Sequence, residues 1–141
     1  MKKYQAKIYR DGKSYSVKFP DLPGCFSMGD TLEEAKSMAK EALSLYLEEA
    51  KDPKWDVPKP KNRKGKGYYW IRTSLEVTIP LMLRQKRIES GFTQAQMAQK
   101  LGITIQQVQK LETPGKSNPP VKTLERISQA LKVDLEIDLV A

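Results

Sequence analysis

The chain contains no histidine and only one cysteine, Cys25, among its 141 residues. The lack of histidine excludes Ser-His-Asp and Cys-His nucleophilic catalysis, histidine general bases and most catalytic zinc sites. A single cysteine also excludes an intrachain disulfide and a zinc site built from four cysteines. Carboxylate chemistry and binding are the functions that remain, and we expect neither a metal nor a cofactor.

Long apolar runs are also missing. No segment approaches the roughly 18 apolar residues that a membrane-spanning helix needs, and the first five residues lack the apolar stretch of a secretory signal. Hydrophobic residues make up 39% of the chain, which suffices for small cores. We therefore expect a cytoplasmic protein made of one or two compact modules.

The positive charge is unevenly distributed. The chain carries a net charge of +8, yet residues 1–52 are balanced, with nine basic and nine acidic side chains. Residues 53–69 carry a net charge of +5, and residues 80–132, with nine basic and three acidic side chains, carry +6. A compact module with this excess predicts a polyanionic partner.

The first part of the chain predicts a β-β-β-α-β module. Residues 4–9 and 15–19 alternate apolar and polar side chains around an Asp-Gly-Lys turn, a pattern typical of a hairpin. After a Pro-Gly loop, residues 25–28 predict a short strand. A capping box and an apolar stripe predict a helix over residues 31–50. The aromatic and β-branched residues of 68–77 predict a fourth strand.

We place a module boundary near Val77, which gives domains 1–77 and 78–141. Residues 51–67 of the first domain are rich in proline, glycine and lysine. We interpret them as an exposed, rather stiff loop without a packed face, with Trp55 and Val57 as the residues able to pin it. Its lysines are interpreted as solvated, with contacts to phosphates of DNA or RNA as the alternative.

The second module predicts four helices. Pro80 suits the first position of a helix that Gly91 ends. Two capping boxes then open short helices over residues 94–101 and 105–112, and a last helix covers 121–131. The two short helices have the length and the glycine break of a helix-turn-helix.

In a helix-turn-helix, the second helix lies in the DNA major groove and presents its N-terminal side chains to base edges. Glutamine pairs with adenine, isoleucine contacts a thymine methyl group, and lysine reaches guanine or phosphate. Gln94, at a helix N-terminus, is placed for a phosphate. The predicted base-facing side chains are Thr104, Ile105, Gln106, Gln107 and Lys110. The alternative, a helical hairpin with solvated glutamines, is disfavoured by the +6 charge.

Residues 133–140 alternate between apolar and acidic side chains until the last pair. A lone strand cannot hide its apolar face, so we expect two copies to pair and form a dimer. The apolar, dimerising side chains are Val133, Leu135, Ile137 and Leu139.

The second module resembles the Cro/repressor (XRE-type) helix-turn-helix domain. The resemblance lies in Thr93 to Thr104, Lys110-Leu111-Glu112, Asn118-Pro119 and Leu124 to Leu131. It implies base-reading positions at Gln106, Gln107 and Lys110, and phosphate contacts at Gln94, Lys116 and Asn118.

The first module resembles the HicB antitoxin family. The resemblance lies in Phe19 to Cys25, Gly29-Asp30-Thr31, Glu34-Ala35 and Ala42-Leu43. It implies an α+β protein in which a partial RNase H-like module precedes an all-α DNA-binding module. It further implies an antitoxin that neutralises HicA, a small toxin that cleaves mRNA, and that represses its own operon. The implied partners are a HicA-type toxin, operator DNA and a second copy of the chain, as a homodimer or a higher even oligomer.

The toxin is expected to bind at one of two surfaces. One is the exposed edge strand with Phe26 and Met28, and the other is the preceding loop of Leu22, Pro23, Gly24 and Cys25. The alternative function is a stand-alone, phage-type transcriptional regulator whose first module senses a ligand or another protein.

A nuclease is a further alternative, because RNase H-like folds are able to cleave phosphodiesters. Two-metal cleavage requires several carboxylates converging on ions about 4 Å apart. The candidates Asp11, Asp21, Asp30 and Glu34 lie in turns, a loop and a helix cap, without an obvious partner carboxylate. We therefore expect no enzyme activity.

Cys25 is interpreted as a small buried residue rather than a nucleophile, because no histidine is present to activate it. Tyr9, Tyr15, Phe19 and Trp70 are interpreted as sheet core, with a base-stacking platform as the alternative.

Overall fold

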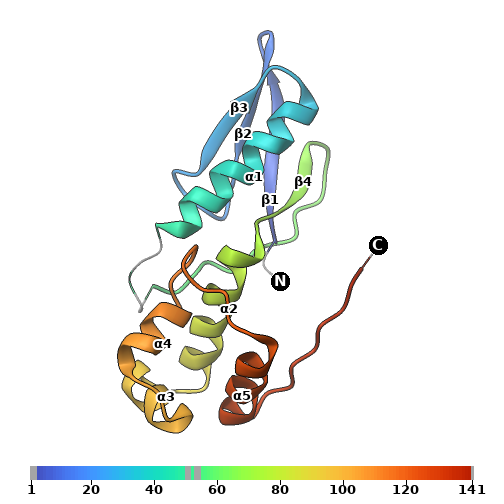
Figure 1. The fold of residues 1–141 in the computed structure, drawn as a ribbon. Coiled ribbons are helices and arrows are strands. Elements are labelled where there is room, and N and C mark those ends of the chain that lie inside the picture. Colours follow the sequence, from blue (N-terminus) through green and yellow to red (C-terminus); the bar gives the residue numbers. More distant parts are fainter. Residues whose placement is uncertain (1–2, 50–51, 53–54, 141) are drawn as a thin grey trace.

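The computed structural model describes residues 3–49, 52 and 55–140 (Figure 1). The predicted helix end at residue 50 and loop positions 51, 53 and 54 lie outside these residues. The elements are β1 (Lys3–Asp11), β2 (Ser14–Lys18), β3 (Phe26–Gly29), α1 (Leu32–Glu48), β4 (Tyr68–Arg72), α2 (Leu75–Glu89), α3 (Gln94–Leu101), α4 (Ile105–Leu111) and α5 (Val121–Leu131). The protein is of mixed α+β class, with the sheet at one end and the helical part at the other.

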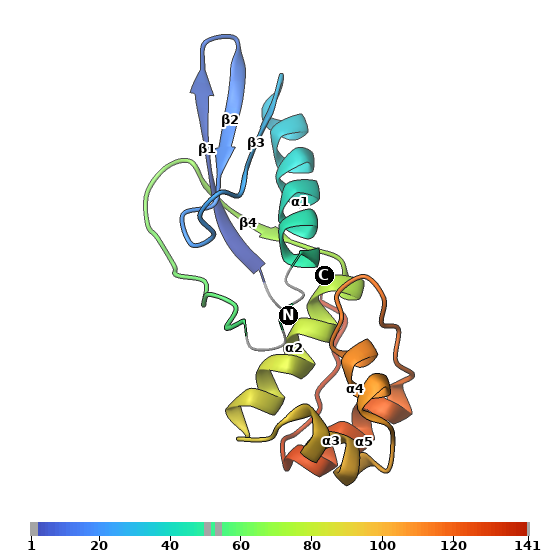
Figure 2. The ribbon, with the colours of Figure 1, turned by 90° about the vertical axis from the view of Figure 1, so that its left-hand side faces the viewer.

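The sheet is antiparallel, in the order β3-β2-β1-β4, and α1 covers one of its faces (Figures 1 and 2). In the register, Ile8 pairs with Val17 and Tyr4 pairs with Ile71. Since side chains alternate along a strand, all four of these side chains face α1, where they are buried. The predicted β-β-β-α-β order is confirmed.

Helix α1 begins at the predicted capping box. The Thr31 hydroxyl accepts a hydrogen bond from the backbone N–H of Glu34 at 3.1 Å. The Glu34 carboxylate in turn accepts the N–H of Asp30 at 3.2 Å. A Cβ on Gly29 would lie 2.5 Å from the nitrogen of Ala35, so β3 approaches the helix this closely only because residue 29 lacks a side chain.

The prediction for residues 73–80 is wrong. Strand β4 ends at Arg72, Ser74 caps α2, and Pro80 lies inside this helix rather than at its start. The physical reason is tertiary packing: Val77 and Leu81, one helical turn apart, are both fully buried against the sheet module. Burial on one helical face outweighs the β-propensity of this segment.

Pro80 removes one hydrogen bond from α2, and a loop residue replaces it. Proline has no N–H, so the carbonyl of Glu76, four residues earlier, loses its helical donor. The N–H of Gly115 donates to this carbonyl at 2.8 Å. Gly115 has a φ of +77°, which glycine adopts without strain. The loop after α4 is thereby fixed to the first turns of α2.

Helix α2 contributes to both hydrophobic cores. Val77 and Leu81 belong to the core between the sheet and α1, whereas Leu83 belongs to the core formed with α3, α4 and α5. Ile79 and Met82 pack against this second core. The boundary that we placed near Val77 therefore falls inside a helix that connects the two modules.

The loop before β4 has a packed side, so the interpretation of it as lacking one is wrong, but the residues named as able to pin it, Trp55 and Val57, are the ones that pack. Val57 is buried in the first core, and the rings of Trp55 and Tyr46 lie 6.5 Å apart. The hydroxyl of Tyr4 donates to the carbonyl of Pro58 at 2.6 Å.

Polar contacts hold the second half of the same loop. Both terminal nitrogens of Arg63 donate to the carboxylate of Asp21, at 2.8 and 3.0 Å, and the N–H of Lys61 donates to it at 2.9 Å. The side chain of Gln5 accepts the N–H of Arg63 at 2.6 Å and donates to its carbonyl at 3.1 Å. The hydrogen bond from Arg63 is the main reason why the pKa of Asp21 lies below its usual value.

Two aromatic residues do not belong to the core. Phe19 is buried, as predicted, and Tyr15 packs against the core. Tyr9 and Trp70 are 42% and 40% exposed, and the prediction is wrong for them. Their positions in the register place them on the sheet face that α1 does not cover.

The expected C-terminal strand is absent from the single chain: residues 132–140 have no strand or helix. Ile137 and Leu139 are 64% and 96% exposed, whereas Leu135 packs against the second core. An extended segment becomes a strand only when a neighbour pairs with its backbone, and the described part of this chain provides none.

None of the helices in the described part of the chain is long and apolar enough to cross a membrane.

We predict that Asp21→Asn loosens the loop before β4. A carboxyl group with a lowered folded pKa stabilises the fold above its unfolded pKa of about 3.9, and this contribution is lost as the pH falls through the folded value. The variant should therefore unfold more easily than the parent at pH 7, with the difference disappearing as the pH falls through the folded pKa of Asp21. Hydrogen exchange at the amides of Lys61 and Arg63 measures the effect locally. Equal exchange in both proteins at pH 7 would contradict it.

Candidate nucleic-acid interface

Helices α3 and α4 form the predicted helix-turn-helix, and both capping boxes are present. Thr93 and Gln96 exchange hydrogen bonds at the start of α3, and Thr104 and Gln107 do so at the start of α4. Gly102 ends α3 with a φ of +67°, in the left-handed region. The turn between the helices is thus fixed by local sequence.

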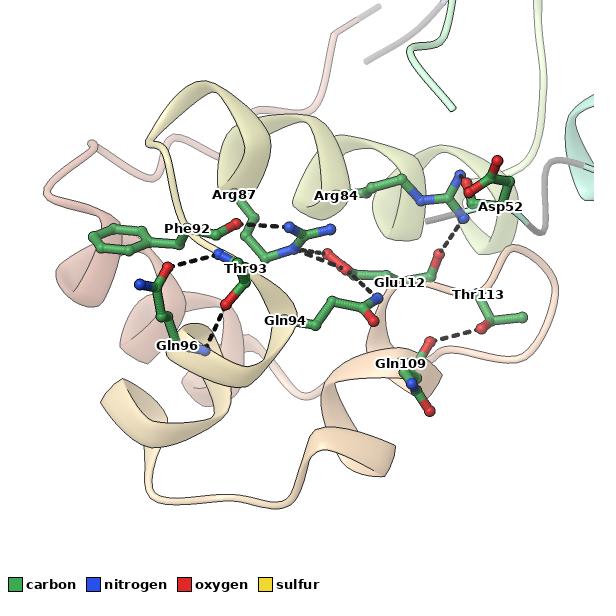
Figure 3. A network of polar contacts seen from close by, with 10 residues as sticks. All are labelled: Asp52, Arg84, Arg87, Phe92, Thr93, Gln94, Gln96, Gln109, Glu112 and Thr113. Carbon is green, nitrogen blue, oxygen red and sulfur yellow. Dashed lines mark hydrogen bonds and ion pairs between the residues drawn. The ribbon is translucent and has the colours of Figure 1, made fainter. Parts of the chain in front are cut away.

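A buried ion pair connects α2 to the end of α4 (Figure 3). Nε of Arg87 lies 2.5 and 3.1 Å from the two carboxylate oxygens of Glu112, and the side chains are 7% and 5% exposed. The side-chain amide of Gln94, at the start of α3, donates to the same carboxylate at 3.0 Å. Arg87 also donates to the carbonyl of Phe92 at 2.7 Å.

Arg84, one turn earlier on α2, extends this network towards the sheet module. Its guanidinium donates to the backbone carbonyl of Glu112 at 3.1 Å and to that of Asp52 at 3.1 Å. Desolvation by burial lowers the pKa of Arg84. The network therefore sets the position of α4 relative to α2, α3 and the chain segment that follows α1.

The residues expected to contact DNA lie mainly on the surface. Gln94 is half-buried, and one of its amide hydrogens is committed to Glu112. Gln107 uses its amide oxygen to accept the N–H of Thr104 at 2.9 Å, which leaves its NH₂ group for other contacts. The exposed members of the set are Thr104, Ile105, Gln106, Gln107, Lys110, Lys116 and Asn118.

A groove of about 500 Å³ adjoins this surface, between α4, the loop after it and α5. Lys110, Lys116 and Arg126 contribute three positive charges to its lining, which contains no acidic residue. Arg126 donates to the carbonyl of Leu101 at 2.5 Å, so its guanidinium is held at the groove. Sequence reasoning missed Arg126, because only the packing of α5 brings it beside α4.

The two expected toxin-binding segments behave differently. Leu22 is fully buried and Cys25 is 5% exposed, so the expectation that they form a docking surface is wrong. Both belong to the sheet core, and burial raises the pKa of the Cys25 thiol to about 11. Phe26 and Met28 on the edge strand β3 are 74% and 60% exposed. Pro23 and Gly24 are also exposed.

Three of the four acidic residues considered for metal-dependent cleavage have other partners. Asp21 pairs with Arg63, Asp11 accepts the Ser16 hydroxyl and Glu34 belongs to the cap of α1. Within the described ranges, no group of three or more cysteine or acidic side chains is arranged to hold a metal ion.

Comparison with known proteins identifies the class of each module. The family described as HicB-like antitoxin of bacterial toxin-antitoxin systems matches residues 4–66, and the helix-turn-helix family matches residues 83–137. The protein is thus a HicB-like domain followed by an XRE-type helix-turn-helix domain.

Relatives support the same assignment over most of the chain. Antitoxin HicB 2 of Photorhabdus laumondii is 26% identical over 135 residues, covering 96% of this chain and 94% of the relative. Antitoxin HicB of Escherichia coli K12 is 29% identical, covering 69% of this chain and 70% of the relative. The UPF0150 protein Ta0767 of Thermoplasma acidophilum is 40% identical over 58 residues, covering 40% of this chain and 84% of the relative. The chain thus carries a HicB-like antitoxin domain over residues 4–66 and is homologous to Antitoxin HicB proteins.

Among solved structures, a chain of a "HicA3 and HicB3 toxin-antitoxin complex" aligns with 52% of this chain and 99% of its own length. The identity is 22% and the TM-score 0.42.

We predict that Glu112→Gln destabilises the protein by about 3–5 kcal/mol, because it removes the buried carboxylate that pairs with the Arg87 guanidinium. The control is Glu89→Gln, which removes the exposed partner of Lys86 and should cost at most about 1 kcal/mol. Urea unfolding of both variants measures the difference. Equal losses of stability would show that the buried pair does not hold α4 in place.

Proposed function

We propose that this protein is an antitoxin of a type II toxin-antitoxin system. It neutralises a HicA-type toxin that cleaves mRNA and, in the cytoplasm, represses its own operon by sequence-specific DNA binding. The observation that carries the proposal is the connection of a HicB-like domain to a helix-turn-helix through one helix, α2, which packs in both cores. The relative Antitoxin HicB 2, aligned over 94% of its length, supports it.

In the proposed DNA complex, α4 lies in the major groove. Gln106 is exposed and stands outside the capping box, so its amide is suited to pair with adenine. Lys110 reaches guanine or phosphate, and Ile105, which is 37% exposed, contacts a thymine methyl group. Lys116 and Asn118 contact phosphates beside the basic groove, where Arg126 adds a further cation.

Operator recognition requires two helix-turn-helix units, since half-sites lie about one helical turn apart. We propose that residues 133–140 of two chains pair as antiparallel strands and thereby close their apolar faces. The exposure of Val133, Ile137 and Leu139 in the single chain supports this pairing. Leu135, packed against the helical core, would fix the strand close to the DNA-binding domain.

We predict that wild-type protein protects two operator half-sites centred about 10–10.5 base pairs apart, or a multiple of this distance. Gln106→Ala should cost on the order of 1–3 kcal/mol at particular base pairs, whereas Lys116→Ala should weaken all sequences alike. Footprinting on a set of operators with single base changes distinguishes these outcomes. Deletion of residues 133–141 provides the dimerisation control, and should abolish the paired footprint. A Gln106→Ala variant with unchanged base preferences would contradict the groove assignment.

The toxin-binding surface that we propose is the edge strand β3. An edge strand has unpaired backbone groups, and Phe26 and Met28 add exposed apolar side chains. The exposed Pro23 and Gly24 extend this surface into the preceding loop. Apolar side chains that remain exposed beside an open edge are typical of an interface with another protein.

We predict that Phe26→Asp weakens toxin binding by at least tenfold, because an apolar contact is replaced by a charge that must be desolvated. The matched control is Leu45→Asp on the outer side of α1, where the side chain is 57% exposed. Co-expression with the small protein encoded beside the gene, followed by co-purification and titration, provides the measurement. If the Phe26→Asp variant still binds the toxin and the Leu45→Asp variant does not, the toxin interface lies on α1 and not on β3.

One observation favours a second function, a phage-type transcriptional regulator. An uncharacterised 14.9 kDa protein of Haemophilus phage HP1 is 45% identical over 56 residues, or 40% of this chain. In such a regulator the first module senses a ligand or a different protein. The same co-expression separates the two functions, because only an antitoxin suppresses the growth defect that a neighbouring toxin causes.

A further inference from the structure

The sheet face opposite α1 carries basic and aromatic side chains that the proposed antitoxin and repressor functions do not use. Helix α1 packs on the other face (Figure 2), and the register places alternate residues of β1, β2, β3 and β4 on this one. We call this surface the open sheet face; by register it comprises Lys3, Gln5, Lys7, Tyr9, Asp11, Ser14, Ser16, Lys18, Phe26, Met28, Tyr68, Trp70 and Arg72. Phe26 and Met28 form its β3 edge, and Gln5, which is 4% exposed, is covered by the loop that carries Arg63.

Three aromatic rings on the open sheet face each have a lysine beside them. The ammonium group of Lys3 lies 4.9 Å from the ring centroid of Trp70, and that of Lys7 lies 4.5 Å from the ring of Tyr68. The ammonium group of Lys18 lies 5.8 Å from the ring of Tyr9. The face thus repeats one unit, a cation next to a ring, across three strands.

The rings are accessible despite these lysines. Tyr9, on the interior strand β1, and Trp70, on the edge strand β4, are 42% and 40% exposed. A lysine above a ring is held by about 0.5–1 kcal/mol at an exposed site, so the ammonium group is readily displaced.

The charge of this region is strongly positive. Lys3, Lys7, Lys18 and Arg72 lie on the face, and Lys64 and Lys66 follow on the loop that Gln5 holds against it. The ammonium group of Lys7 donates to the carbonyl of Lys66 at 2.7 Å, which brings the loop beside the face. Two acidic groups lie nearby: Asp11, which accepts a hydrogen bond from the Ser16 hydroxyl at the hairpin end of the face, and Asp21, which is paired with Arg63.

We propose that the open sheet face binds single-stranded nucleic acid. Phosphates contact the lysine ammonium groups, and bases stack on the rings of Tyr9, Tyr68 and Trp70. Exposed aromatic residues on an uncovered antiparallel sheet, flanked by basic side chains, provide both interactions that a single strand requires. A phosphate that draws an ammonium group away from a ring frees that ring for a base.

A single strand fits this face better than the alternatives. Duplex DNA keeps its bases stacked on one another, so exposed rings add nothing to its binding. The proposed toxin surface, Phe26 and Met28, is the apolar β3 edge of the same face. The basic part around Tyr68 and Trp70, across β1 and β4, would repel a toxin that carries positive charge of its own in order to bind mRNA. The open sheet face is separate from the helix-turn-helix.

The test measures binding of a fluorescein-labelled 12-nucleotide uridine RNA to the full-length protein by anisotropy at about 50 mM salt. Tyr9→Ala combined with Trp70→Ala should weaken binding by about tenfold or more, as expected for the loss of two stacking platforms. Leu45→Ala with Lys40→Ala, on the exposed side of α1, is the matched control and should leave the affinity within twofold. Circular dichroism confirms that each variant is folded.

A spectroscopic measurement keeps the test valid if the double alanine variant fails to fold. The chain has two tryptophans, Trp55 and Trp70. Added uridine or thymidine 12-mer should quench the fluorescence of the Trp55→Phe variant, in which only Trp70 emits, and leave that of Trp70→Phe unchanged. The stacking ring retained in Trp70→Phe should keep most of the affinity.

Three results would overturn the proposal. The first is no binding of either 12-mer by the wild type. The second is equal binding of a 12-base-pair duplex and the RNA by the variant with both Lys110→Ala and Lys116→Ala, in which the helix-turn-helix is weakened, because this would mean attraction of any polyanion. The third concerns two double variants. If Lys110→Ala with Lys116→Ala loses RNA binding and Tyr9→Ala with Trp70→Ala binds normally, the RNA-binding site lies on the helix-turn-helix. None of these results depends on toxin binding or operator repression.

Discussion

The buried pair of Arg87 and Glu112 is the interaction on which the arrangement of the DNA-binding surface depends. Two charges have been taken out of water here, and their mutual hydrogen bonds, with those of Gln94 and the Phe92 carbonyl, compensate for the lost hydration. The pair joins α2 to the end of α4. A helix as short as α4, with only Val108 buried among its residues, takes its orientation largely from such contacts.

Helix α2 transmits this constraint to the sheet module. It carries Arg84 and Arg87 towards the helix-turn-helix and Val77 and Leu81 into the sheet core. The carbonyl freed by Pro80 binds Gly115, which precedes the phosphate-contacting candidate Lys116. A partner that docks on the sheet module therefore acts on a structure connected to the DNA-binding loop by packing and hydrogen bonds, which suits a protein proposed to combine neutralisation with repression.

The two faces of the sheet have different chemical roles. One is apolar and stabilises the fold against α1, while the other carries lysines and rings that contribute little to the core. Alternation along a strand makes this division possible. Tyr9 and Trp70 were interpreted as core because sequence gives the spacing of side chains but not the face that a helix covers. The register and the position of α1 decided that they are exposed.

The sequence alone determined the features that depend on near neighbours: the hairpin, the capping boxes at Thr31, Thr93 and Thr104, and the glycine that ends α3. These are set by backbone geometry and hydrogen bonds within a few residues. Only the tertiary structure decided that residues 75–80 are helical, that Leu22 and Cys25 are buried, and that Arg126 lies beside α4. Each of these depends on contacts between residues distant in the chain, which local patterns do not specify.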